Sequence, residues 1–236
     1  DTFNHYFEPE NALAAVRVLE AAGYLVHRPH TRTERPLCCG RTFLAVGQIE
    51  QAREEVQRML KVLQPYIQAG VPVIGLEPSC LLTLRDEFKV LHPGEHTRAL
   101  AAQAFLLEEF IAEEVRAKRW ALQFKPLAKR VLLHGHCHQK AADAMSAVEQ
   151  TLRLIPELRV DVIQSSCCGM AGSFGYEAEH HAISMQMAEA AVLPAVRAAA
   201  AEDVIVADGT SCRHQIADGT NKEAVHIARI LAAHLE

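Results

Sequence analysis

The chain has 236 residues, of which 50% are hydrophobic and 22% are charged, a composition typical of a globular protein with one large or two small domains. Its net charge is −5 and no basic stripe is visible, which argues against a nucleic-acid partner. No apolar run approaches the roughly 20 residues that cross a bilayer, so we expect no transmembrane segment. We also expect no signal peptide and, because the chain does not begin with Met, a fragment of a longer polypeptide.

The first half alternates between helical patterns and short apolar runs. Apolar residues recur at helical spacing in two long stretches, and Gly23 and Gly70 follow these stretches as end signals. The predicted elements are, in order, helix 10–22, strand 24–27, helix 49–69, strand 71–76, helix 81–88 and helix 97–118.

The second half repeats this alternation after a predicted linker at 123–129. Its predicted elements are strand 130–133, helix 141–154, strand 160–164, a helix from 177 to 192, strand 204–207 and helix 222–234. Short apolar strands alternating with helices indicate parallel α/β units. We therefore predict an α/β fold with two pseudo-symmetric Rossmann-like halves, 1–125 and 126–236, each a small parallel sheet flanked by helices.

The seven cysteines are grouped, and two Cys-Cys-Gly triplets occur, at 38–40 and at 167–169. Adjacent cysteines hold their Cα atoms about 3.8 Å apart, closer than the roughly 4.4–6.8 Å that a disulfide prefers. An odd number of grouped cysteines fits a reducing compartment and metal binding better than a disulfide framework. The alternative is that the pairs are buried free thiols that pack as small hydrophobic residues.

A third cysteine follows each triplet at a similar distance: Cys80 in the first half and Cys212 in the second. The second half also has Cys137, whereas the equivalent stretch of the first half, 1–4, has no cysteine. Each cysteine follows a predicted strand, and in parallel sheets ligands bind beyond the carboxyl ends of the strands. We therefore expect the cysteines to converge at these ends, four in the second half and three in the first.

Three histidines, His134, His136 and His138, alternate around Cys137 as residues of an extended segment do. They are candidates for hydrogen-bond donors to sulfur, for occasional metal ligands or for proton carriers. The alternative is that they are polar residues at the end of a strand.

These motifs resemble a known family. The matching stretches are DTFNHYFEPENALAAVRVLEAAGY (1–24), CCGRTF (38–43), VIGLEPSC (73–80), HGHCHQKA (134–141), CCGMAGSFGYE (167–177) and DGTSCRHQ (208–215). The chain is similar to the cysteine-rich CCG domain found in the B subunit of heterodisulfide reductase. It also resembles the iron–sulfur subunits of glycolate oxidase, lactate-utilisation proteins and anaerobic glycerol-3-phosphate dehydrogenase. It looks most like the C-terminal module of fused FAD-linked oxidases.

The resemblance implies that the cysteines bind an iron–sulfur cluster, a 4Fe-4S cluster in the second half. The implied ligands there are Cys137, Cys167, Cys168 and Cys212, with Gly169 supplying a backbone N–H group. Further candidates are Cys38, Cys39 and Cys80 of the incomplete first-half site, together with His136 and His138. The family pattern ends in Cys-x-x-Cys, but Gln215 and Thr83 stand at the last position here, which puts a five-cysteine cluster in doubt. Zinc is a possible substitute, because it also accepts four thiolates.

The resemblance implies an electron-transfer module within an oxidoreductase. Electrons would come from FAD on another domain or subunit of a 2-hydroxy-acid dehydrogenase of the glycolate, lactate or 2-hydroxyglutarate type. They would go to a quinone or another carrier, with a ferredoxin-like iron–sulfur segment as a further partner. The expected location is cytoplasmic, or peripheral at the inner membrane through partners. Two alternatives remain: disulfide reduction at a cluster, as in heterodisulfide reductase, and a non-redox zinc or structural domain.

Overall fold

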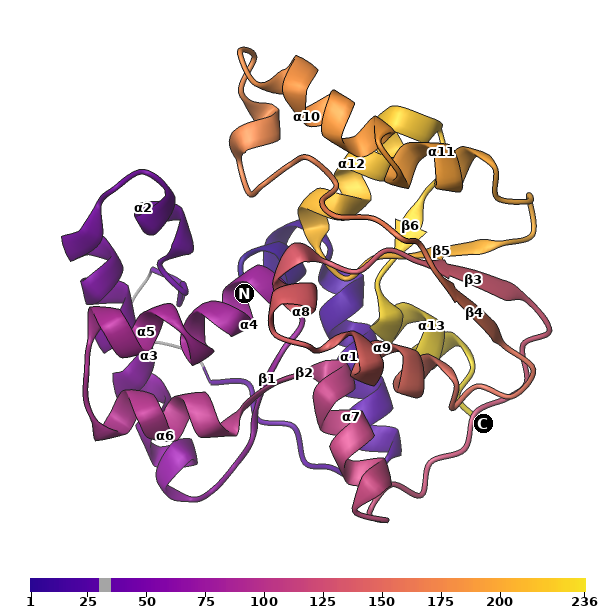
Figure 1. Ribbon diagram of the computed structural model, residues 1–236. Helices are drawn as coiled ribbons and strands as arrows, with labels where there is room; N and C mark the ends of the chain where they lie inside the picture. The colour runs from indigo at the N-terminus through magenta and orange to yellow at the C-terminus, as the bar shows by residue number, and fades with distance from the viewer. Residues whose placement is uncertain (30–34) are drawn as a thin grey trace. The chain divides into compact units, whose positions relative to one another are not determined.

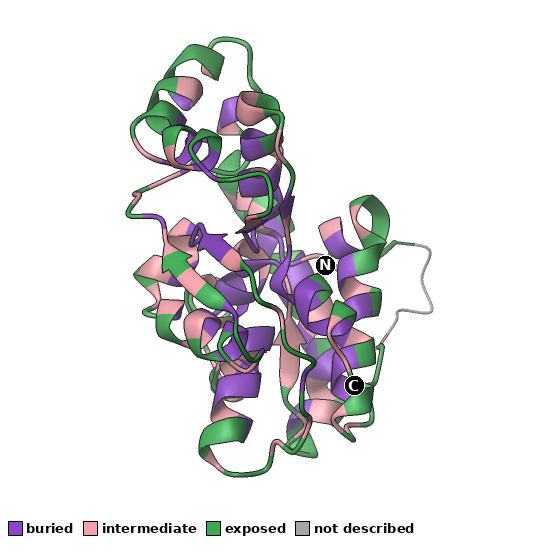
Figure 2. Cartoon of the chain, turned by 90° about the vertical axis from the view of Figure 1, so that its right-hand side faces the viewer, coloured by how far each residue is buried: buried purple, intermediate pink, exposed green. Residues whose placement is uncertain are grey.

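The computed structural model describes residues 1–29 and 35–236, which form two compact units, Asp1–Phe110 and Ile111–Glu236. The predicted α/β class is confirmed, because each unit has a small parallel sheet with flanking helices (Figure 1). Buried residues lie on several of the strands and on one face of many helices, and much of the periphery is exposed (Figure 2). Each unit therefore has a hydrophobic core of its own.

The first unit is mainly helical around a two-stranded sheet. Strand β1 (Val73–Gly75) pairs in parallel with strand β2 (Ala104–Leu106), and Ile74 lies opposite Phe105. The helices are a π-helix η1 (Phe3–Phe7), α1 (Pro9–Ala21), α2 (Arg41–Ala45), α3 (Ile49–Gln68), α4 (Pro78–Arg85), α5 (Glu87–Leu91) and α6 (Glu95–Gln103). The predicted helices 10–22 and 49–69 are confirmed as α1 and α3.

Two predictions in the first unit are wrong. The helix predicted at 97–118 is interrupted, because residues 104–106 form β2 and a new helix, α7 (Leu107–Arg116), follows. The alanine-rich run before β2 favours a helix locally, but pairing with β1 buries Ala104 and Leu106 and overrides that preference. The strand predicted at 24–27 pairs with no strand in the described part of the chain, and Leu25 is 81% exposed there.

The second unit is built on a four-stranded parallel sheet with the order β4-β3-β5-β6. The strands are β3 (Arg130–Leu133), β4 (Arg159–Val162), β5 (Val204–Val206) and β6 (Ala224–Val225). In the register, Leu132 of β3 lies between Asp161 and Ile205. The helices after α7 are α8 (Cys137–Ala141), α9 (Met145–Leu152), a 3₁₀ turn η2 (Phe174–Tyr176), α10 (His181–Glu189), α11 (Val192–Arg197), α12 (Thr210–Thr220) and α13 (Ile227–Ala233). Helices α11 and α12 lie on one face of the sheet, and α9 and α13 lie on the other (Figure 1).

Local backbone conformation explains where the predicted helices of this unit differ from the observed ones. The helix predicted at 141–154 is split, because Asp143 adopts a left-handed conformation with φ +55° between α8 and α9. The helix predicted at 222–234 begins as strand β6, which adds to the sheet beside β5. The helix predicted at 177–192 starts only at His181 and continues as α11. Helix α12 was not predicted.

The predicted domain boundary, between residues 125 and 126, falls inside the second unit. The backbone N–H of Lys125 donates to the carbonyl oxygen of His234 at 2.8 Å. The N–H of Leu127 likewise donates to Pro156 at 2.9 Å, and Phe124 forms a β-bridge with Leu235. These bonds attach the predicted linker to the second unit, and helix α7 spans the observed division.

Candidate functional site

The four cysteines of the second unit lie beyond the carboxyl ends of three neighbouring strands. Cys137 follows β3 and begins α8, the pair Cys167-Cys168 follows β4, and Cys212 lies in the first turn of α12 after β5. Because parallel strands end at the same edge of the sheet, segments distant in sequence meet there. The predicted convergence of these cysteines is what the structure shows.

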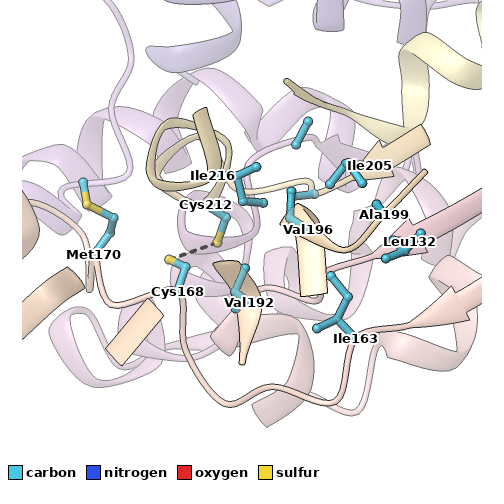
Figure 3. Close-up of a cluster of buried hydrophobic side chains, with 12 residues drawn as sticks. Leu132, Ile163, Cys168, Met170, Val192, Val196, Ala199, Ile205, Cys212 and Ile216 are labelled. Atoms are coloured by element: carbon cyan, nitrogen blue, oxygen red, sulfur yellow. Dashed lines mark hydrogen bonds between the residues drawn. The ribbon is translucent and has the colours of Figure 1, made fainter. Parts of the chain in front are cut away.

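The four sulfur atoms are linked in one row. The Sγ atoms of Cys168 and Cys212 are 3.4 Å apart and point toward one another (Figure 3). The Cys137 thiol hydrogen-bonds to Cys167, and Cys167 in turn to Cys168. All seven cysteines of the chain are free thiols. The arrangement is a thiol cluster that can accept a metal centre.

One end of the row is buried and the other is not. Cys168 and Cys212 are 2% and 1% exposed, and they pack with Met170, Val192 and Ile216 in an apolar cluster (Figure 3). Cys137 and Cys167 are only partly buried. A group bound to all four sulfurs would thus be anchored in the core and approached from the side of Cys137 and Cys167.

Hydrogen bonds within the row determine the electrostatics of the thiols. The bond between Cys137 and Cys167 lowers the pKa of Cys167, with further lowering by the N–H groups of Gly169 and Ala171, and it raises the pKa of Cys137. The N–H of Gly169 lies 3.2 Å from the Cys167 sulfur. Its φ of +93° turns that group toward the sulfur, a conformation that favours glycine. The predicted contact of Gly169 with the cysteines is therefore present.

The two buried thiols are shifted in opposite directions. Hydrogen bonding with Cys167 and Cys212, together with burial, raises the pKa of Cys168. The bond to Cys168 lowers the pKa of Cys212, and His134 lowers it further. The lowered pKa values of Cys167 and Cys212 favour thiolate at these two positions, and thiolate is the form that binds metals.

Of the three histidines, His134 is the one that the structure groups with buried sulfurs. A ring nitrogen of His134 and the sulfurs of Cys168 and Cys212 all lie within 4.8 Å of one another. His136 instead caps α8, because its Nδ1 accepts from the N–H of His138 at 3.1 Å while Gln139 Oε1 accepts from the His136 N–H at 2.9 Å. Alternation around Cys137 gave no means to rank the three histidines.

Two charged residues near the row were missed by the sequence analysis. Lys140 Nζ donates to the carbonyl oxygens of Ser165 at 2.5 Å and Ser166 at 2.8 Å, which holds the loop that leads into Cys167. Burial lowers the pKa of Lys140, although the neighbouring cysteines oppose this shift. Arg213, buried on α12, donates to the carbonyl oxygens of residues 207 and 208 and so fixes the start of that helix. Lys140 lies 25 residues from the loop that it holds, and the sequence gave no means to detect that pairing.

Asp208, at the end of β5, does not cap the helix that follows it. Its carboxylate accepts from Gln139 Nε2 at 2.9 Å and from the N–H of Ile227 at 3.0 Å. It is 1% exposed, so it joins α8, β5 and α13 through buried hydrogen bonds. Glu77, which follows β1 in the first unit, does cap the next helix, because its carboxylate accepts from Ser79.

The first unit brings its three cysteines together in a similar way. The N–H of Gly40 lies 3.4 Å from the Cys38 sulfur. Hydrogen bonding with Cys38 lowers the pKa of Cys39, but the neighbouring Cys80 and burial outweigh it and raise that pKa to about 12. The hydrogen bond with Cys39, together with burial, raises the pKa of Cys38. This site repeats the turn of the second unit with one sulfur fewer.

None of the helices in the described ranges is long and apolar enough to cross a membrane.

Residues 2–85 and 131–217 match the family model described as "Cysteine-rich domain" (CCG). The two matched stretches each contain one Cys-Cys-Gly triplet and the cysteine that follows it.

The chain is similar to several curated proteins. It is 28% identical to the C subunit of the anaerobic glycerol-3-phosphate dehydrogenase of Escherichia coli K12 over 99% of this chain and 57% of the relative. It is 25% identical to the D-2-hydroxyglutarate dehydrogenase of the same strain, over 92% of this chain and 20% of the relative. The lactate utilization protein A of Geobacillus kaustophilus is 24% identical over 71% of this chain and 69% of its own length. The chain thus spans only part of each relative. No solved structure matched it.

Proposed function

Since the chain belongs to the cysteine-rich (CCG) domain family, we propose that its second unit binds an iron–sulfur cluster and serves as an electron-transfer module of a flavin-linked dehydrogenase. The observation that carries this proposal is the row of four free thiols at the carboxyl ends of β3, β4 and β5. The proposed ligands are Cys137, Cys167, Cys168 and Cys212.

The residues present fit such a cluster. Iron–sulfur clusters of the four-iron type are held by four cysteine thiolates, and backbone N–H groups directed at sulfur tune them. The second unit supplies both, the N–H groups coming from Gly169 and Ala171. When bound, a cluster takes up and gives up single electrons.

The names of the relatives suggest the partners. A dehydrogenase subunit, a D-2-hydroxyglutarate dehydrogenase and a lactate utilization protein all align with this chain. We propose that a reduced flavin on another domain or subunit loses two electrons, one at a time, through this module. A quinone, or another carrier, would accept two electrons and two protons in total. The organic substrate would be a 2-hydroxy acid bound at the flavin.

Neither unit has a fifth cysteine ligand. At the position of the last cysteine in the wider family pattern, the second unit has Gln215 and the first unit has Thr83. Gln215 Nε2 donates to the backbone oxygen of Ser184 at 3.2 Å and to its hydroxyl at 3.0 Å. In the first unit, the Thr83 hydroxyl donates to the carbonyl oxygen of Ser79 at 2.8 Å. Both side chains are engaged in structural bonds. We therefore favour an electron carrier over a module that reduces disulfides at a five-cysteine cluster.

The test is iron and acid-labile sulfide content, with an EPR spectrum, on protein reconstituted without oxygen. About four irons per chain are expected, and about eight would mean that the three-cysteine site is also filled. Cys167→Ser and Cys168→Ser should remove most of the iron, whereas the matched changes Cys38→Ser and Cys39→Ser should remove little. Absence of iron with one tightly bound zinc would overturn the proposal in favour of a structural zinc domain.

A further inference from the structure

His134 has an unusual position for a buried polar side chain. It is 0% exposed, and its Nε2 atom has no hydrogen-bond partner among the described residues. Burying a ring nitrogen without a partner costs about 1–3 kcal/mol, so such an atom calls for an explanation. The groups beside the ring are the sulfurs of Cys168 and Cys212.

The other ring nitrogen indicates which one carries the proton. His134 Nδ1 lies 3.0 Å from the hydroxyl oxygen of Ser165. That oxygen also faces Lys140 Nζ at 3.3 Å, and an ammonium group can only donate. The Ser165 hydroxyl must then direct its own hydrogen elsewhere. Nδ1 at 3.0 Å is a better acceptor than the carbonyl oxygen of Ile163 at 3.5 Å.

This chain of donors favours one tautomer of the His134 ring. A neutral imidazole has one N–H, so a ring that accepts at Nδ1 carries its hydrogen on Nε2. Lys140 thus donates to Ser165, Ser165 donates to His134, and the Nε2–H group is left for the sulfurs. The same chain argues against Nε2 as a metal ligand, because a ligating nitrogen must offer a lone pair.

We propose that His134 donates an N–H···S hydrogen bond to the Cys212 sulfur and thereby raises the reduction potential of the group that this sulfur binds. Hydrogen bonds to sulfur favour the reduced state, because that state places more negative charge on the sulfurs. The effect is strong in a buried site, where water does not screen it. His134 acts through Cys212 and is a positioning residue. The effect on potential rests on the proposed function, but the tautomer does not.

The first measurement requires no cluster. In ¹⁵N-labelled apo-protein with reduced thiols, long-range ¹H–¹⁵N spectra report the tautomer of each histidine. We expect the ring hydrogen of His134 to lie on Nε2. A hydrogen on Nδ1 would overturn the proposal, whether or not the protein binds iron.

The second measurement is the midpoint potential of the reconstituted protein by EPR-monitored titration. His134→Leu should keep its iron but shift the one-electron equilibrium about tenfold toward the oxidised state, which is about 59 mV. His134→Asn, which retains an N–H donor, should recover part of the shift. The control His234→Leu removes a half-buried histidine whose Nδ1 contacts the Ile230 carbonyl oxygen, and it should leave the potential unchanged.

The outcomes separate the two proposals. If the wild-type chain binds no iron, the proposed function fails, and the tautomer alone decides whether the hydrogen bond exists. If all variants hold iron at the same potential, the influence of His134 on potential is refuted while the proposed function stands. If His134→Leu and His134→Asn both lose iron that the control retains, His134 is a ligand and the donor role is wrong.

Discussion

Replacing Gly169 with alanine should damage the second unit far more than the same change at Gly172, three residues along the loop. Both glycines have positive φ, +93° and +74°, so either alanine adds about 1–2 kcal/mol of backbone strain. A Cβ atom on Gly169 would lie 2.0 Å from the backbone oxygen of Ser184, whereas one on Gly172 would meet nothing within 4 Å. Only Gly169→Ala therefore forces two backbone segments apart.

The size of the effect follows from that distance. A carbon and an oxygen rarely approach within 3.0 Å, so the loop or α10 must move by about 1 Å, and overpacking of this kind costs about 1–3 kcal/mol. Alanine also reduces the conformational entropy of the unfolded chain, which raises the free energy of unfolding by about 0.4–1 kcal/mol in both variants and offsets part of the loss. We expect Gly169→Ala to lose about 2–4 kcal/mol of unfolding free energy and Gly172→Ala about 1 kcal/mol or less. Gly40→Ala should fall between them, since its Cβ would lie 3.2 Å from the Ala52 backbone oxygen.

Urea denaturation of the reduced apo-proteins measures these differences, and iron uptake measures their consequence for the site. Moving the Gly169 backbone also displaces its N–H from the Cys167 sulfur, so Gly169→Ala should bind iron poorly even where it remains folded. Equal unfolding free energies for Gly169→Ala and Gly172→Ala would refute the reasoning from close approach. Normal iron uptake by a folded Gly169→Ala would refute the role of the N–H group.

Two further predictions concern buried and charged groups of the same unit. Asp208→Ala should lower the free energy of unfolding, measured by urea denaturation, by about 2–5 kcal/mol, because it leaves the Gln139 amide and the Ile227 N–H buried without an acceptor. A decrease below about 1 kcal/mol would contradict this expectation. Arg130 lowers the pKa of Asp203 below its ordinary value of 3.8. The ionised carboxylate therefore stabilises the folded state fully above about pH 4, and this stabilisation is lost as the pH falls through the lowered pKa of Asp203. Arg130→Ala should therefore flatten the acid side of the stability–pH curve below about pH 4, and an unchanged slope there would contradict the coupling.

The sequence was sufficient for the fold class and for the grouping of the cysteines. Strand β3 matched its prediction at both ends, because Val131 to Leu133 form an apolar run and nothing competes with a strand there. Strand β2 was missed because its alanine-rich neighbourhood favours a helix, and only pairing with β1 makes it a strand. Helix α12 was missed because its sequence contains weak helix formers such as Ser211 and Gly219, while Cys212 and Ile216 anchor it in the core.

The sequence predicted only those parts of the site that residue type and spacing identify. The cysteines are recognisable by their type and spacing, so their convergence could be inferred from the sequence alone. The choice of His134 over His136 depends on which ring faces the sulfurs and which caps α8, and only the folded structure shows this. Lys140 acts on a loop 25 residues away, and such pairings exist only once the strands are in register.

The two cysteine sites differ in charge as well as in the number of sulfurs. A cluster held by four thiolates is an anionic group, which a neighbouring cation stabilises and a neighbouring anion destabilises. In the second unit, Lys140 interacts electrostatically with all four cysteines. In the first unit, the buried carboxylate of Glu55 opposes ionisation of Cys38 and is itself held by Arg35 and Arg58. The charged groups beside the sulfurs therefore differ between the two sites, with a lysine in the second unit and a carboxylate held by two arginines in the first.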